Sequence, residues 1–196
     1  MTRLSLSISV LVAALITSTA EQAVATEPAL PPAIRLVNLI KPHEREMLAL
    51  RFMVTVSPIP LPEGIADCSV AKATPALKEY FARLYATELD ERELGEAVVF
   101  FESNEGQSAV SLRLQHDQNI YTAAAKGQTI DSEDPHYPTQ VQKALDSFGA
   151  TVAGKAFIGK DELISRQPFR REISGLRDSA LGDCIRELAA GEKRGS

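Results

Sequence analysis

Residues 90–107 read DERELGEAVVFFESNEGQ, and this stretch decides the fold of the chain. Asp90, followed three residues later by Glu93, has the form of a capping box, in which each side chain accepts a hydrogen bond from the other residue's backbone N–H. A helix is therefore expected to begin at this point and to end near Phe101. Ser103 is a good acceptor for the first turn of a second helix. The stretch thus predicts a helical hairpin with a short connection.

Apolar side chains recur at helical spacing on both sides of this hairpin, and each such pattern predicts a helix with one buried face. The predicted helices cover residues 34–40, 43–56, from 69 or 74 up to the hairpin, 90–101, 104–125, 139–152 and 172–190. Signals for strands are scarce. We therefore expect an all-α fold, a compact bundle of about six or seven helices built on the central hairpin, with no internal repeat or coiled coil long enough to count.

Prolines and glycines set several of the expected boundaries. Pro42 is expected to split the first two helices, and a proline-rich loop is expected over residues 57–67. Pro75 fits the first turn of the helix that follows. Thr139 is suited to cap the helix over 139–152, and Gly149 weakens the far end of that helix.

The N-terminus has the three parts of a secretory signal peptide. Arg3 supplies a basic start, residues 4–16 form an apolar stretch, and Ala23-Val24-Ala25 is an exit site of the A-x-A type. We predict cleavage after Ala25, with Ala20 as a second position. The apolar run is shorter than the roughly 20 residues that span a membrane, so the mature protein is expected to have no membrane span. A periplasmic location follows, with secretion as the alternative.

The expected organisation has four parts. They are a signal peptide (1–25), an extended proline-rich lead-in (26–33), a single helical domain (34–190) and a flexible tail (191–196). The net charge of −5 arises from 21 basic and 26 acidic side chains. Proteins that bind the phosphate backbone need clusters of basic residues, so nucleic acid is not an expected partner.

Cys68 and Cys184 are the only two cysteines of the chain. An exported chain meets an oxidising compartment, where such a pair is expected to form a disulfide. The acidic neighbours Asp67 and Asp183 disfavour the thiolate, which argues against a nucleophilic or redox-active cysteine. The remaining alternative is two buried free thiols.

The segment from Leu77 to Val110 carries a recurring aromatic pattern around the capping box. Its spaced positions are Tyr80, Phe81, Tyr85, Leu89, Glu93 and Leu94, followed by Phe100, Phe101, Ser103, Gly106 and Gln107. This ending resembles the core helical hairpin of an exported proteobacterial family that is catalogued only as a domain of unknown function. Asn104 stands where that family often has proline. The resemblance implies an all-helical periplasmic protein and transfers no catalytic or binding residue.

Asp131, Glu133, Asp134 and His136 are the best candidates for a metal site, because hard cations favour oxygen-rich loops. The loop lacks the glycine and terminal glutamate of a calcium-binding loop, and a solvated acidic loop is the alternative reading. His116 lies on the apolar stripe of its predicted helix, where a buried, hydrogen-bonded histidine is the alternative to a ligand. No fingerprint of a nucleotide or phosphate loop occurs, so no cofactor is expected.

Tyr85, Phe100 and Phe101 could line a groove that binds an apolar ligand, although such an aromatic stripe also serves to hold a helical hairpin together. Charge is distributed unevenly around them. Residues 79–134 contain 12 acidic and 4 basic side chains, whereas residues 155–194 contain 7 and 9. This difference is either a solvated outer face or an acidic face that meets a basic partner.

The sequence favours a non-enzymatic module of the bacterial envelope that binds an envelope protein or an apolar ligand. One alternative is a metal-assisted hydrolase of envelope material that uses the loop 131–136 together with His116. Another is a periplasmic chaperone or stress protein, which the sequence does not separate from the first reading.

Overall fold

The computed structural model describes residues 31–128, 135–158 and 162–195, with side chains up to residue 191. These parts of the chain form eight α-helices and one 3₁₀ turn and contain no strand, so the all-α prediction is confirmed. The elements are α1 (Pro32–Ile40), α2 (Pro42–Thr55), α3 (Ile65–Glu88), α4 (Glu91–Glu102), α5 (Asn104–Ala125), α6 (Thr139–Gly149), α7 (Val152–Lys155), η1 (Leu163–Ser165) and α8 (Gln167–Gly195).

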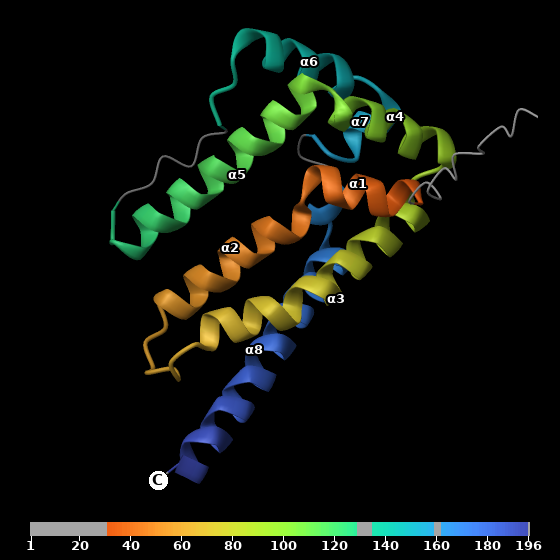
Figure 1. Ribbon diagram of the computed structural model, residues 1–196. Helices are drawn as coiled ribbons and strands as arrows, with labels where there is room; N and C mark the ends of the chain where they lie inside the picture. The colour runs from red at the N-terminus through yellow and green to blue at the C-terminus, as the bar shows by residue number, and fades with distance from the viewer. Residues whose placement is uncertain (1–30, 129–134, 159–161, 196) are drawn as a thin grey trace, which may run out of the picture.

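The helices form two groups, which are connected by α1 and by the contact of α2 with α5 (Figure 1). In the first group α3 packs against α2 and α8, and in the second α5 packs against α6 while α7 joins α4 and α6. α1 contacts both α3 and α4 and so connects the groups. The last turns of α8 extend past the α2–α3 connection (Figure 1). The largest side chains that are almost fully buried are Tyr85, Phe81, Leu36, Leu50, Leu77, Leu163 and Ile173.

The hairpin of α4 and α5 has the predicted local structure. The Asp90 side chain accepts from the Glu93 backbone N–H at 2.8 Å, and the Glu93 side chain accepts from the Asp90 N–H at 2.9 Å. Ser103 Oγ accepts from the Gly106 N–H at 3.0 Å and donates to the Phe100 carbonyl at 2.6 Å. Gly106 is required at this turn, because a Cβ there would overlap the Phe100 carbonyl.

A second copy of this turn joins α6 to α7. Thr151 Oγ1 accepts from the Gly154 N–H at 2.9 Å and donates to the Phe148 carbonyl at 2.8 Å, and a Cβ on Gly154 would overlap that carbonyl. The phenylalanines of the two turns, Phe100 and Phe148, stack with ring centroids 4.1 Å apart. This repetition spans only seven positions, which is too short to count as an internal repeat of the fold.

Several predicted boundaries were wrong. Pro138, not Thr139, occupies the N-cap of α6, and Thr139 is its first residue. The helix predicted over 139–152 is two helices, because the hydroxyl of Thr151 starts α7. Pro42 is the first residue of α2, and the break from α1 lies at Lys41, which has a left-handed φ of 51°.

Pro75 lies inside α3 rather than in its first turn, because α3 begins at Ile65. A proline within a helix leaves the carbonyl four residues earlier, here that of Ala71, without its N–H donor. Ala71 and Pro75 are both exposed, so water can reach that carbonyl. The opposite face of α3, with Ser69, Ala73 and Leu77, is buried and keeps the helix continuous.

The domain limits also differ from the expected ones. α1 begins at Pro32, so two residues of the expected lead-in 26–33 are helical, and α8 continues through Gly195 into the expected tail 191–196. The predicted signal peptide (1–25) lies outside the described residues. None of the helices described by the structure is both long enough and apolar enough to cross a membrane.

Cys68 on α3 and Cys184 on α8 form a disulfide, as predicted, with their Cα atoms 6.0 Å apart. The bond joins the start of α3 to the middle of α8. Nearby, Lys72 Nζ lies 2.6 Å from the Glu187 carboxylate in an exposed ion pair between the same two helices.

Candidate functional site

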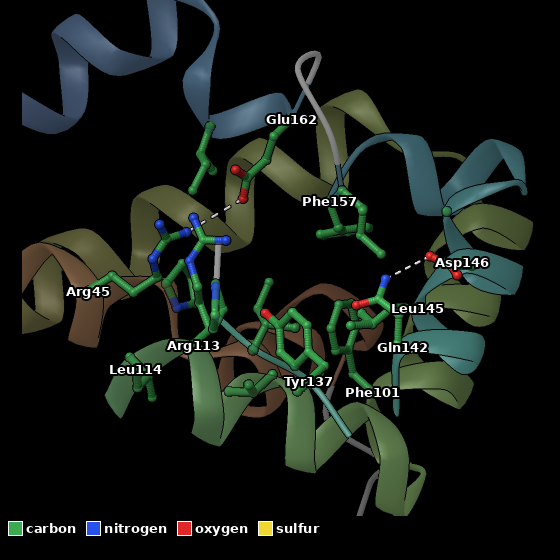
Figure 2. Close-up of a pocket in the computed structure, with 18 of the residues that line it drawn as sticks. Arg45, Phe101, Arg113, Leu114, Tyr137, Gln142, Leu145, Asp146, Phe157 and Glu162 are labelled. Atoms are coloured by element: carbon green, nitrogen blue, oxygen red, sulfur yellow. Dashed lines mark hydrogen bonds and ion pairs between the residues drawn. The ribbon is translucent and has the colours of Figure 1, made fainter. Parts of the chain in front are cut away.

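A cavity of about 820 Å³ opens where the two groups of helices meet. It is bounded by the α1–α2 junction, by α3 through Tyr85, by α4 through Phe101, and by α5, α6 and the segment that leads into η1. Its walls are mainly apolar (Figure 2); the aliphatic and aromatic side chains include Ile40, Tyr85, Phe101, Val110, Leu114, Leu145, Phe157, Ile158 and Ile164. A volume of this size is typical of pockets for small organic ligands.

Charged groups gather at one end of the cavity. Figure 2 shows the guanidinium groups of Arg45 and Arg113 next to one another and facing Glu162. Arg45 Nη1 lies 3.6 Å from Glu162 Oε1, and Arg45 Nε donates to Asp117 Oδ2 at 2.7 Å. Arg113 Nε lies 3.5 Å from the other oxygen of Asp117, one helical turn away on α5. Asp117 therefore bridges the two arginines from outside the cavity wall.

Burial changes the proton affinity of this cluster. Burial raises the pKa of Glu162 above its ordinary value, although the positive charges of Arg45 and Arg113 act in the opposite direction. Burial by itself lowers the pKa of Arg45, but Asp117 and Glu162 outweigh it and leave that pKa raised. Burial also raises the pKa of Tyr85, which therefore stays neutral in the apolar wall. Burial therefore disfavours the negative charge of Glu162.

The opposite side of the cavity is polar but carries no arginine. There Gln142 Nε2 donates to Asp146 Oδ1 at 2.8 Å, and both residues are on the exposed face of α6 (Figure 2). Tyr137 lies between the two ends. The cavity is thus apolar through its middle, with its basic groups at one end.

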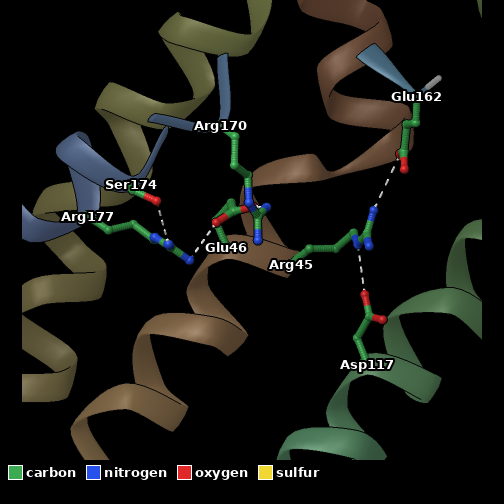
Figure 3. A network of polar contacts seen from close by, with 7 residues as sticks. All are labelled: Arg45, Glu46, Asp117, Glu162, Arg170, Ser174 and Arg177. Atoms are coloured by element: carbon green, nitrogen blue, oxygen red, sulfur yellow. Dashed lines mark hydrogen bonds and ion pairs between the residues drawn. The ribbon is translucent and has the colours of Figure 1, made fainter. Parts of the chain in front are cut away.

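A second ion-pair network lies behind the first and joins α2 to α8 (Figure 3). Glu46 follows Arg45 in sequence but points to the other side of α2, toward Arg170 and Arg177. Arg177 Nη1 lies 2.7 Å from Glu46 Oε2, close in distance though not aligned as a hydrogen bond, and Arg170 Nη1 donates to Glu46 Oε1 at 3.3 Å. Arg177 Nη2 also contacts Ser174 Oγ at 3.1 Å. Glu46 and Arg177 are both buried, so this network serves packing.

The structure separates the three aromatic residues predicted to line a groove. Tyr85 and Phe101 both lie in the wall of the cavity. Phe100 points to the other side of α4 and stacks on Phe148, beside a shallow apolar depression that includes the exposed side chains of Val99 and Val152. Adjacent residues of a helix point about 100° apart, and here this turns Phe100 away from the wall that Phe101 forms.

The predicted metal site falls largely outside the described residues, which do not include Asp131, Glu133 or Asp134. His136 is exposed, and His116 is half-buried on α5. In the part of the chain that the structure describes, no group of three His, Cys, Asp or Glu side chains is arranged to hold a metal ion.

Arg45, Arg113 and Glu162 were not among the residues singled out from the sequence. Arg113 and Asp117 have the i, i+4 spacing that places them on one face of a helix, which was a usable local signal. Arg45 lies 72 residues before Asp117, and no local pattern connects them. Comparisons of this chain with models of known protein families, with curated proteins and with solved structures gave no match.

Proposed function

We propose that this chain is a non-enzymatic binding protein of the bacterial envelope that holds a largely apolar small molecule in the cavity between its two helix groups. The observation that carries the proposal is a cavity of about 820 Å³ with apolar walls and a few polar groups at its ends. Such a composition is typical of sites that take up organic ligands, whereas a protein partner is usually met by a flatter surface.

The envelope location rests on the sequence. A basic start, a short apolar core and the A-x-A exit before Thr26 support export by a cleavable signal peptide. The motif from Phe100 to Gln107 supports kinship with the exported helical family that it resembles. Mass measurement of the protein from the periplasmic fraction tests this part: a mature chain that begins at Thr26 is expected, and an uncleaved cytoplasmic chain would contradict it.

Binding is tested with the fluorescent apolar probe N-phenyl-1-naphthylamine and with decan-1-ol as competitor. Wild-type protein is expected to bind the probe saturably and to release it to decan-1-ol. Leu114 lines the cavity from α5, so Leu114→Trp places a large ring inside it and is expected to weaken probe binding roughly tenfold.

Leu112→Trp is the matched control, because Leu112 is on the same helix and equally half-buried but does not line the cavity. This variant is expected to bind the probe like the wild type, and circular dichroism checks that both variants are folded. Absence of saturable binding to the wild type, or equal weakening by both variants, would contradict the proposal.

A further inference from the structure

We propose that the ligand of this cavity is an amphipathic anion, a molecule with one carboxylate or similar acid group on an apolar chain, whose acid group binds Arg45 and Arg113 in exchange for Glu162. This inference rests on the proposed function and names the class of its ligand. It is carried by the position of the two guanidinium groups at one end of a cavity whose middle is apolar (Figure 2).

The bonding of the arginines favours an acid group as ligand. Each guanidinium carries five N–H donors in a fixed plane and matches carboxylate geometry. Asp117 binds Arg45 through a single 2.7 Å hydrogen bond to Nε, which leaves the outer nitrogens of Arg45 directed at the cavity end. Of the described carboxylates that line the cavity, Glu162 lies at this end, 3.6 Å from Arg45 Nη1 and beyond hydrogen-bond distance.

Glu162 is therefore a replaceable partner. Its attraction to Arg45 and Arg113 is opposed by its burial, which raises the pKa of its carboxyl group. Among the described residues, the other titratable groups around it are Asp117 on α5, Arg170 on α8 and Tyr85 on α3. A ligand carboxylate can bind the two guanidinium groups directly. Glu162 then turns to solvent or takes up a proton.

A cationic ligand fits this end poorly, because its head group would face two guanidinium groups. A neutral ligand would leave the pairing of Glu162 unchanged. The middle of the wall, with Phe101, Leu145, Phe157 and Ile158, offers apolar surface to the rest of the molecule. A molecule with one acid group on an apolar chain matches both the arginine end and the apolar middle of the cavity.

The test compares three ligands of equal chain length as competitors of N-phenyl-1-naphthylamine: decanoate, decan-1-ol and decyltrimethylammonium. Decanoate is expected to bind roughly tenfold tighter than decan-1-ol, the effect of a charge-assisted hydrogen bond. Arg113→Gln is expected to reduce decanoate affinity to that of decan-1-ol while leaving decan-1-ol unchanged. Glu162→Gln is expected to strengthen decanoate binding only. Arg83→Gln removes an exposed arginine of α3 and serves as the matched control.

The pH dependence gives an independent readout with decanesulfonate, which stays ionised. Its affinity is expected to rise as the pH falls through the raised pKa of Glu162, because a protonated Glu162 no longer competes for the arginines. In Glu162→Gln this dependence should be lost.

The outcomes separate the two proposals. If decan-1-ol binds and decanoate binds no tighter, or if Arg113→Gln weakens both equally, the anion inference is wrong and the apolar cavity stands. Tightest binding of decyltrimethylammonium would also overturn it. If none of the three ligands displaces the probe from the cavity, both proposals fail.

Discussion

Burial disfavours the negative charge of the Glu162 carboxylate. The residue therefore gives the stability of the folded chain a measurable dependence on pH. Because its pKa is raised in the folded state, the folded chain binds more protons than the unfolded chain between the ordinary value of 4.5 and the raised value. Stability contributed by this residue therefore falls as the pH rises through that window.

Replacing Glu162 by Gln removes this titration. The variant is expected to be more stable than the wild type at neutral pH, and the difference should shrink as the pH approaches 4.5. Urea unfolding of both proteins over a pH series measures it, with the exposed Glu79→Gln as control. A variant that is less stable than the wild type at neutral pH would show that the ion pair with Arg45 outweighs burial.

Gly106 and Gly95 both lie in helices, but an added Cβ has space only at Gly95. A Cβ on Gly106 would overlap the backbone of Phe100, whereas a Cβ on Gly95 meets no atom. Gly106→Ala is expected to destabilise the fold by about 1–3 kcal/mol through overpacking, and Gly95→Ala to stabilise it by up to about 1 kcal/mol through helix propensity. Denaturant titration of the two variants tests this. Equal effects would mean that the turn adjusts freely around the added methyl group.

At the scale of elements, the buried ion pair between α2 and α8 is the contact whose loss should matter most. The side chains of Glu46 and Arg177 are only 7% and 9% exposed, so neither charge can be solvated when its partner is removed. Glu46→Gln is expected to cost about 3–5 kcal/mol of unfolding free energy.

The matched control for this prediction is again Glu79→Gln, which breaks an exposed i, i+4 pair with Arg83 on α3 and should cost less than about 0.5 kcal/mol. Equilibrium unfolding in urea measures both changes. If Glu46→Gln cost no more than the control, the network of Figure 3 would be contributing little to the docking of α8.

Helix boundaries were predictable to the extent that local chemistry sets them. The capping box at Asp90 and the serine cap at Ser103 were correct, because each depends on residues within three positions. Pro75 was misplaced for the opposite reason. The free-energy cost of a proline inside a helix is set by the local backbone. The packing of α3 against α2 and α8 outweighs this cost, and the local sequence does not reveal that packing.

On the scale of the whole molecule, the disulfide joins Cys68 to Cys184, whose separation in the sequence is 116 residues. It therefore closes a loop that contains most of the described fold. Cross-linking a loop of this length is expected to contribute about 3–5 kcal/mol by restricting the unfolded chain. Reduction should therefore lower the melting temperature by on the order of 10 °C in a domain of this size.

Thermal unfolding with and without a reductant measures this change. The double variant Cys68→Ala, Cys184→Ala should melt near the temperature of the reduced wild type and be insensitive to reductant. Titration of two reactive thiols in the unreduced, denatured protein would contradict the bond.

The helical class, the hairpin of α4 and α5 with its caps, and the pairing of the two cysteines were all predictable from the amino-acid sequence. These depend on spacing within a few residues, or on there being only two cysteines to pair. The sequence did not determine which side of α4 faces the cavity, so Phe100 was grouped with Phe101.

The cavity and its arginine cluster were not predictable from the sequence, because they form only when the helices pack together. Arg45, Arg113 and Glu162 come from three distant parts of the chain, and their approach depends on how α2, α5 and η1 pack. Packing is set by the summed burial of many side chains across the fold, which no local pattern records. The cavity therefore depends on how the helices assemble, whereas the helices themselves depend on local sequence.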